Sequence, residues 1–185
     1  MDHAAGGRID GGMARAPSLS DRGVAALLAE RPTHGFEVAG VFGKDGPLGI
    51  VWTIQRQQVY RALRHLVAEG LAEPVREEES HRGPARTVYA LTELGATEVE
   101  AWLLAPVGRL RSVRHELLLK LAFLERRGGD PAPLVREQRR IAVEMVRQCA
   151  LRLEEVEAEE RIVLAWRLES ARALLGMLDR LDGAR

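Results

Sequence analysis

The residues best suited to bind a ligand lie between Thr53 and Glu69, where arginine and amide side chains recur at helical spacing. The apolar residues of this segment are three or four positions apart and would face a core: Val59, Ala62, Leu63 and Leu66. The opposite surface carries cations and amides and no carboxylate before Glu69. In the DNA major groove, arginine pairs with guanine and glutamine pairs with adenine. This face therefore predicts DNA contact, the alternative being an ordinary solvated helix surface. The residues assigned to the contact are Thr53, Gln55, Arg56, Gln58, Tyr60, Arg61 and Arg64.

The elements around this segment follow the order of a DNA-binding module. Thr53 can cap a helix over Ile54–Glu69. Two strands, 71–79 and 86–91, can then pair as a hairpin, and a further helix is predicted over Thr92–Leu104. Helix, β-hairpin wing and helix, in this order, are typical of a winged helix-turn-helix, which lays one helix in the major groove. We interpret Ile54–Glu69 as that recognition helix.

The tip of the predicted hairpin carries the other candidate DNA contacts, His81, Arg82 and Arg86. In a winged helix this tip lies against the sugar-phosphate backbone or the minor groove, although charge is also common in turns for solubility. The outgoing strand carries the acidic run Glu77–Glu79, which would repel phosphate. We therefore expect only the tip and the returning strand to approach DNA.

The chain before the recognition helix is predicted to form a tail and two short helices. Residues 1–17 are rich in Gly and Ala, show no periodicity and are expected to be disordered. Ser18 or Ser20 can cap a first helix over Asp21–Glu30, and a second helix follows Gly35. The core candidates of the second helix are Phe36, Val38 or Ala39, and Val41 or Phe42.

The remainder of the chain is helical in pattern. Arg109–Arg127 is predicted to be one helix, and its inward residues are Leu117, Leu118, Leu121 and Leu124. Apolar residues then repeat at intervals of four and three in two stripes, Ala142, Val146, Cys149, Leu153, Val156 and Leu164, Leu168, Ala171, Leu175, Leu178. The acidic run Glu154–Glu160 separates the stripes and would turn the chain into an antiparallel helix pair. Because a thin helical region cannot bury both stripes, we predict pairing between two chains.

The composition of the chain indicates its cellular compartment and the kinds of partner that it can bind. The formal net charge is zero, and Leu19–Thr92 holds equal numbers of basic and acidic residues, so DNA binding requires charges that segregate onto one face. The single cysteine, Cys149, excludes an intramolecular disulfide and fits a reducing compartment. No apolar run reaches the ~20 residues that span a bilayer. The first residues also lack the apolar core of a signal peptide, so we expect a cytoplasmic protein with no membrane partner.

No pattern in the chain indicates catalysis or metal binding. The five His residues have no ligand-like spacing to one another or to Cys149. Neither a nucleophile–base pair, nor a glycine-rich phosphate loop, nor a carboxylate dyad stands out. We therefore predict a protein that is not an enzyme and uses no cofactor and no metal.

These patterns predict a mainly α fold, a winged helix-turn-helix with a small β-hairpin wing plus a C-terminal antiparallel helical dimerisation domain. The predicted boundaries are a disordered tail over 1–17, a DNA-binding domain over 18–105, and a helical dimerisation and effector domain over 106–185.

Four segments resemble the PadR family of transcriptional regulators. They are Gln58–Leu66 followed by Glu69-Gly70-Leu71, Arg82–Gly95, Pro32–Val38 and His115–Leu121. The last is similar to the opening of the long helical C-terminal domain found in one branch of the family. The resemblance implies a homodimeric repressor, of a kind commonly induced by small aromatic or cationic compounds. Two departures leave the base preference open: the loop Gly43–Trp52 is longer and richer in glycine than the family pattern, and Gln57 stands where a small residue is common.

Trp102 and Trp166 are the candidate effector-binding residues, because aromatic residues make up only 4% of the chain. The alternative is that both fill a core or a dimer interface. The sequence as a whole predicts a dimeric, ligand-responsive transcriptional repressor that binds double-stranded operator DNA. An alternative from a different class is a winged helix that serves as a protein-interaction module, which the neutral charge favours.

Overall fold

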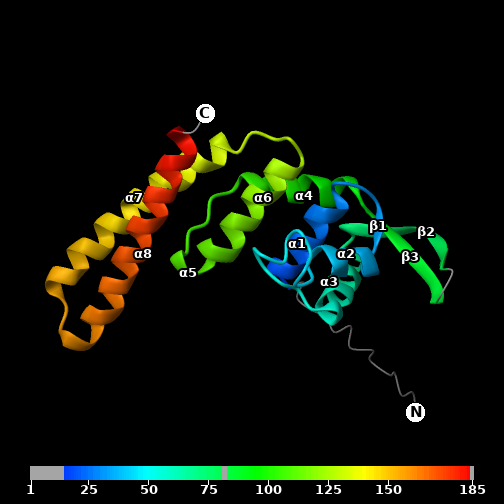
Figure 1. Cartoon of the computed structure of the whole chain (residues 1–185), viewed down its shortest axis with the longest axis horizontal. Helices are drawn as coiled ribbons and strands as arrows, with labels where there is room; N and C mark the ends of the chain where they lie inside the picture. The colour runs from blue at the N-terminus through cyan, green and yellow to red at the C-terminus, as the bar shows by residue number, and fades with distance from the viewer. Residues whose placement is uncertain (1–14, 81–82, 184–185) are drawn as a thin grey trace, which may run out of the picture.

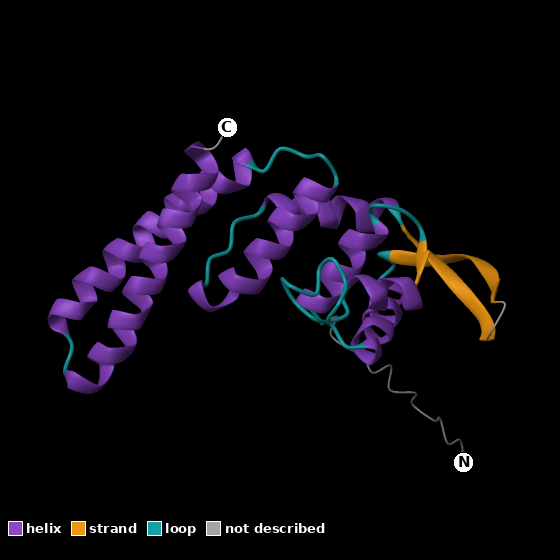
Figure 2. Cartoon of the chain, viewed as in Figure 1, coloured by secondary structure: helices purple, strands orange, loops and turns teal. Residues whose placement is uncertain are grey.

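The computed structural model describes residues 15–80 and 83–183. These residues form a mainly helical molecule with one small sheet, which confirms the predicted fold class (Figures 1 and 2). The wing lies at one end of the molecule and the α7–α8 helix pair lies at the other (Figure 1). The predicted tail over 1–17 falls mostly outside the described residues. In chain order the elements are α1 (Leu19–Leu28), β1 (Thr33–His34), α2 (Gly35–Val41), α3 (Arg56–Ala68), β2 (Ala72–Ser80), β3 (Gly83–Leu91), α4 (Glu93–Leu104), α5 (Leu110–Ser112), a π-helical turn (Val113–Leu117), α6 (Leu118–Arg126), α7 (Ala132–Glu155) and α8 (Ala158–Gly183).

Helix α1 begins at a reciprocal cap, and Ser18 is the residue that provides it. The backbone N–H of Asp21 donates to Ser18 Oγ at 3.2 Å, and the N–H of Ser18 donates to Asp21 Oδ2 at 2.7 Å. Two N–H groups that a helix leaves unpaired at its start are thereby satisfied. The buried face of α1, with Val24 and Leu28, then packs against α3.

Helix α3 begins two residues later than predicted. Gln55, not Thr53, occupies the N-cap position, and its N–H donates to Gln58 Oε1 at 3.0 Å. Thr53 Oγ1 instead donates to a carbonyl of the preceding loop at 3.2 Å. Ile54 is buried, and its N–H donates to Phe42 O at 3.1 Å. Threonine is the better cap by propensity, but burial of the next residue in the core overrides that preference.

The wing is a three-stranded antiparallel sheet in the order β1-β3-β2. Strands β2 and β3 form the predicted hairpin, whereas β1 was not predicted. In β1, Thr33 pairs with Tyr89 and His34 pairs with Val88. A two-residue strand shows no alternation in the sequence, so periodicity could not reveal it. Through β1, the start of α2 is tied directly to the wing.

Helix α4 approaches the end of α3 so closely that only glycine fits at Gly95. A Cβ atom at this position would lie 1.9 Å from Leu71 O. Thr92 Oγ1 donates to Gly70 O at 2.8 Å, and Thr92 N donates to Leu71 O at 3.1 Å. Gly70 itself has φ 68°, the left-handed conformation that commonly ends a helix. The end of α3, the base of the wing and the start of α4 are therefore held together at one point.

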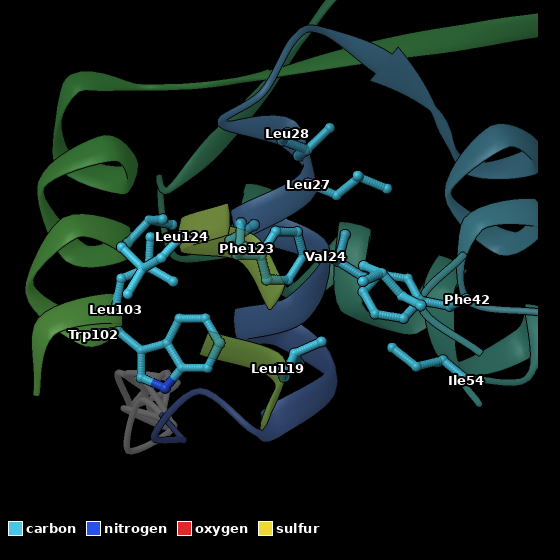
Figure 3. Packing of buried hydrophobic residues seen from close by; sticks show 14 of the residues in the cluster. Val24, Leu27, Leu28, Phe42, Ile54, Trp102, Leu103, Leu119, Phe123 and Leu124 are labelled. Atoms are coloured by element: carbon cyan, nitrogen blue, oxygen red, sulfur yellow. The ribbon is translucent and has the colours of Figure 1, made fainter. Parts of the chain in front are cut away.

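One buried cluster joins the winged helix to the first C-terminal helices (Figure 3). Helix α4 contributes Trp102 and Leu103, and α1 contributes Val24. Helix α6 adds Leu119 and Phe123, both 0% exposed. The core thus includes residues on both sides of position 105, where the domain boundary was predicted.

The segment predicted as one helix over Arg109–Arg127 is instead α5, the π-helical turn and α6. Leu118 and Leu121, predicted to face inward, are only half-buried. The buried apolar residues of this segment are Leu117, Leu119, Phe123 and Leu124. Because Leu117, Leu118, Leu119 and Leu121 are nearly consecutive, the sequence offers several apolar faces and could not select one. A π-turn also shifts the register from the regular helical spacing.

Helices α7 and α8 form the predicted antiparallel pair, and the chain reverses between Glu155 and Ala158, within the predicted acidic run. The stripe on α8 is buried at Leu164, Leu168, Ala171, Leu174 and Leu178, so Leu174 takes the place predicted for Leu175. On α7, Ala142 is buried, whereas Cys149 and the other predicted members are half-buried. The two stripes thus cover each other only in part.

We predict that Gly95→Ala lowers the free energy of unfolding by more than about 3 kcal/mol, because the new methyl group would overlap a backbone carbonyl that cannot move alone. Gly40→Ala is the matched control, since Gly40 also lies in a helix and a Cβ atom there meets nothing within 4 Å. The control should be neutral or gain up to about 1 kcal/mol. Urea unfolding followed by circular dichroism measures both. Equal stabilities for the two variants would contradict the close approach of α4.

Candidate nucleic-acid interface

The exposed face of α3 carries cations and amides without acidic partners. Arg61 and Arg64 are exposed, and neither forms a hydrogen bond or an ion pair with another described residue. Gln57 and Gln58 are also exposed one turn earlier. The opposite face is buried at Val59, Ala62, Leu63 and Leu66, as predicted. The buried face fixes the rotation of the helix, so the arginines point to solvent.

Tyr60 lies at the junction of α2 and α3, where the sequence left its role open. It is half-buried, and a Cβ atom on Gly35 would lie 2.7 Å from Tyr60 Cε1. The tyrosine ring therefore packs directly over the first residue of α2. This contact sets the distance between the two helices of the helix-turn-helix.

Phe36 was predicted as a core residue, but its side chain is 49% exposed. Phe42, at the end of the same helix, is the residue buried in the core. The guanidinium carbon of Arg56 lies 5.3 Å from the centre of the Phe36 ring, and that of Arg86 lies 4.6 Å from it. Arg56 is the first residue of α3 and Arg86 lies on β3. One aromatic ring thus brings together a cation from the recognition helix and a cation from the wing.

Acidic residues on the wing are arranged as the sequence suggested. Glu78 lies opposite Arg86 in the β2–β3 register, yet its carboxylate pairs with Arg76 Nη2 at 2.7 Å. Arg86 is half-buried and forms no ion pair with a described residue. The two other predicted wing contacts, His81 and Arg82, lie outside the described residues.

Trp102, one of the two predicted effector residues, is 7% exposed and lies at the junction of α1, α4 and α6. Its Nε1 donates to Glu116 Oε1 at 3.0 Å, and Arg22 and Lys120 also approach this oxygen, at 3.3 and 3.4 Å. Lys120 is buried, which lowers the pKa of its amine, and Glu116 partly offsets that effect. Lys120 Nζ also donates to Ala105 O at 2.5 Å, at the end of α4. These polar contacts connect the winged helix to α6.

A cavity of about 250 Å³ lies beside Trp102, between α1 and α4. Its walls include Leu66 of the recognition helix and two carboxylates, Asp21 and Glu98. Asp21 is 1% exposed, and His65 Nδ1 of α3 lies 3.2 Å from its Oδ2. A compound bound in this cavity would therefore contact side chains of α1, α3 and α4 at the place where these helices pack together.

Trp166, the other predicted effector residue, has a different environment. It lies on α8, is 63% exposed and borders an open groove of about 680 Å³ between α7, α8 and the loop before α5. Arg109, Arg111 and Arg167 line the same groove. The structure therefore does not bring the two predicted tryptophans into one site.

Residues 15–80 and 83–183 show neither a metal site nor a membrane-spanning helix. Within that range, no set of three or more His, Cys, Asp or Glu side chains is arranged to hold a metal ion. None of the helices in the same range has the length and apolar character needed to cross a membrane.

The order of elements, the three-stranded wing and the carboxylate-free face of α3 define a winged helix-turn-helix of the DNA-binding type. Residues 24–101 match the sequence model of the transcriptional regulator PadR-like family. The likeness to that family thus covers somewhat less than half of the chain and lies in its winged-helix part.

Two curated proteins are similar to the chain. The probable transcriptional regulator Rv1176c of Mycobacterium tuberculosis is 31% identical over 91 residues, which are 49% of this chain and 47% of that protein. The negative transcriptional regulator PadR of Bacillus subtilis is 26% identical over 101 residues, 55% of this chain and 54% of that protein. The chain thus matches about half the length of each relative. The family and both relatives are described as transcriptional regulators, and none of these descriptions names an enzyme.

Among solved structures, Bacillus subtilis PadR in complex with operator DNA is similar to the chain, with a TM-score of 0.47 and 20% sequence identity. The likeness covers 90% of this chain and 99% of that one.

Proposed function

We propose that this protein is a dimeric repressor of transcription that acts in the cytoplasm and binds operator DNA through α3 and the wing. The observation that carries the proposal is the face of α3 beside the β-hairpin wing, where Arg61 and Arg64 are exposed and have no acidic partner among residues 15–80 and 83–183. The likeness of residues 24–101 to the PadR-like family supports transcriptional regulation, and the negative regulator among the similar proteins supports repression. In this proposal residues 18–105 form the DNA-binding domain, which also holds the effector cavity, and residues 106–185 form the dimerisation domain.

Charge segregation makes DNA binding compatible with a neutral chain. The acidic residues of the wing lie on β2, whereas Arg86 lies on β3 and faces the start of α3. On α3, Arg61 and Arg64 are free to meet base edges or phosphates. Phosphate affinity depends on local positive charge more than on the net charge of the chain. In this arrangement Gln57, Gln58, Arg61 and Arg64 read bases, and Thr53, Gln55 and Tyr60 lie near the backbone.

Dimerisation is proposed to use the α7–α8 pair. Near the start of α8, three large apolar residues are exposed in the single chain, Ile162 at 76%, Val163 at 50% and Trp166 at 63%. Exposed apolar residues grouped on one helix indicate an interaction surface. A second copy of the chain is the natural occupant, because two winged helices related by a two-fold axis match a palindromic operator with half-sites about 34–36 Å apart.

The cavity beside Trp102 is the proposed effector site. Its volume suits a compound with a single aromatic ring, and its walls belong to α1, α3 and α4. Trp102 is linked through Glu116 and Lys120 to α6, which leads toward the dimerising helices. A ligand here would shift the position of α4, and so the spacing of the two recognition helices. Trp166 is assigned to the dimer surface instead.

We predict that Arg64→Ala weakens operator binding by roughly 1–3 kcal/mol and random-sequence binding by much less, because a base contact is lost. Operator duplexes are first selected from a random pool with the wild-type protein. Fluorescence anisotropy at several salt concentrations then gives both affinities. Arg140→Ala is the matched control, since Arg140 is an exposed helical arginine that pairs with Glu137 on α7. The control should bind both duplexes as the wild type does.

For the wild type, log affinity should fall with log salt at a slope of about −0.9 per phosphate neutralised. A flat salt dependence, with no duplex enriched in the selection, would contradict DNA binding and favour a protein-interaction module.

We predict that the double substitution Ile162→Glu with Trp166→Glu converts the dimer to a monomer while the helices remain folded. Both side chains are exposed in the single chain, so charge is tolerated there until a partner must cover it. The control is Arg161→Glu, at another exposed position of α8. It changes the charge at one residue more than either Ile162→Glu or Trp166→Glu does, and this variant should remain dimeric. Sedimentation velocity reads the assembly state. A dimer of unchanged stability in the double variant would place the interface elsewhere.

We predict that a single-ring aromatic inducer quenches tryptophan fluorescence and weakens operator binding over the same concentration range. By linkage, operator DNA must weaken the inducer's binding by the same factor. Trp102→Phe should abolish most of the quenching, whereas Trp166→Phe should leave it unchanged. Quenching that disappears in Trp166→Phe, or that leaves operator affinity unchanged, would contradict the proposed effector site.

A further inference from the structure

Phe36 occupies a position where an exposed aromatic ring needs an explanation. It lies in the first turn of α2, and half of its side chain is open to solvent although Phe42 and Val38 of the same helix are fully buried. Its neighbours are His34, with ring centroids 6.3 Å apart, and the two guanidinium groups of Arg56 and Arg86. Burial therefore does not account for the ring, but its contacts with cations do.

The two arginines reach the ring from different parts of the fold. Arg56 also lies 5.7 Å from the centre of the Tyr60 ring, so the first side chain of α3 is held between two aromatic rings. Arg86 approaches Phe36 from β3. The two guanidinium carbons can be no farther apart than the sum of their distances to the Phe36 centre. That sum, 5.3 plus 4.6 Å, sets an upper limit of 9.9 Å. Two like charges held on one ring repel each other, and the aromatic ring offsets part of that cost.

Neither His34 nor Glu78 can replace Phe36 as the support of Arg86. The Nδ1 atom of His34 accepts a hydrogen bond from Glu37 N at 3.1 Å, so in the neutral ring the proton resides on Nε2. That Nε2–H then faces Arg86 Nη1, 3.4 Å away, and two donors cannot form a hydrogen bond. Glu78, opposite Arg86 across the strands, is engaged by Arg76. The stacking contact on Phe36 is therefore the contact that holds Arg86.

We propose that Phe36 positions Arg56 and Arg86 as a two-arginine site for one phosphate of the DNA backbone, at the junction of recognition helix and wing. Among the described residues, neither arginine has an acidic partner, and a phosphate oxygen is the anion that paired guanidinium groups bind best. Backbone contacts set the register of a protein on DNA without reading sequence. This site locks the helix and the wing to the same point of the backbone, while Arg61 and Arg64 read bases.

The proposal rests on the proposed function, and its test separates the two. The full-length wild type and Phe36→Leu are titrated with the selected operator duplex and with a random duplex. Phe36→Leu should weaken both by about threefold to tenfold, the same factor for each, because a backbone contact is affected. Phe36→Tyr keeps the ring and should bind as the wild type does. Phe36→Met, apolar and without a ring, repeats the loss if Phe36→Leu is poorly folded by circular dichroism.

A double-mutant cycle tests whether Phe36 acts through the arginines. Arg56→Ala and Arg86→Ala should each weaken both duplexes, and removing both arginines should reduce the salt slope by about 0.9 in total, because the pair neutralises one phosphate. In the double Arg56→Ala, Arg86→Ala background, Phe36→Leu should cost less than about twofold, because its partners are already gone. Additive losses would assign Phe36 a role unrelated to the arginines and overturn the proposal.

Replacing single operator phosphates by neutral methylphosphonate identifies the phosphate itself. One replacement per half-site should weaken the wild type strongly and weaken the Arg56→Ala, Arg86→Ala protein little. Absence of any such position, or wild-type affinity for Phe36→Leu, overturns the two-arginine site while leaving DNA binding intact. A wild-type protein that binds neither duplex overturns the proposed function and this site together.

Discussion

The contact between Gly95 and the carbonyl of Leu71 governs how the other elements can be placed. A Cβ atom there would lie 1.9 Å from Leu71 O, so helix α4 and the turn after α3 touch backbone to backbone. The hydroxyl of Thr92 caps α4 and also holds Gly70 O, so one threonine joins the two helices. The wing begins and ends at this point. The orientation of the recognition helix, the direction of the wing and the course of α4 toward the C-terminal helices therefore follow from one short contact.

The two sides of α3, the helix that ends at this junction, have different environments. Leu66 on one side of α3 and Trp102 on α4 line the cavity beside α1, whereas Arg61 and Arg64 on the other side of α3 remain exposed. Phe36, an aromatic residue at the edge of the core, contacts Arg56 and Arg86, which have no carboxylate partner in the described part of the chain. The chain is neutral overall, but the exposed arginines of α3 have no acidic partner among the described residues. A neutral composition is therefore compatible with the proposed DNA binding. The same α4 that closes the junction also carries the proposed effector contact.

Helices and strands with a regular apolar repeat were predictable from the sequence. Short elements, such as a two-residue strand or a single π-helical turn, were not. The four buried residues on α3, the hairpin and the reversal between α7 and α8 followed from spacing alone. The strand β1 and the π-helical turn Val113–Leu117 leave no periodic signal, so packing alone determines them. For the candidate site, arginine positions were evident in the sequence. The pairing of Arg56 with Arg86 on Phe36 was not, because it joins segments thirty residues apart and gives an aromatic residue an exposed position. In the sequence, Phe36 stood out only as part of the segment Pro32–Val38, which resembles a PadR-family motif.

In the proposed dimer, two winged helices occupy adjacent turns of one operator. Hydroxyl-radical footprinting of the full-length protein on its selected duplex measures this directly. We expect two symmetry-related sets of protected sugars whose centres lie about 10–10.5 base pairs, one helical turn, apart. Flanking protection from the wings should accompany each set. A single protected stretch without two-fold symmetry, or uniform weak protection along the whole duplex, would contradict it.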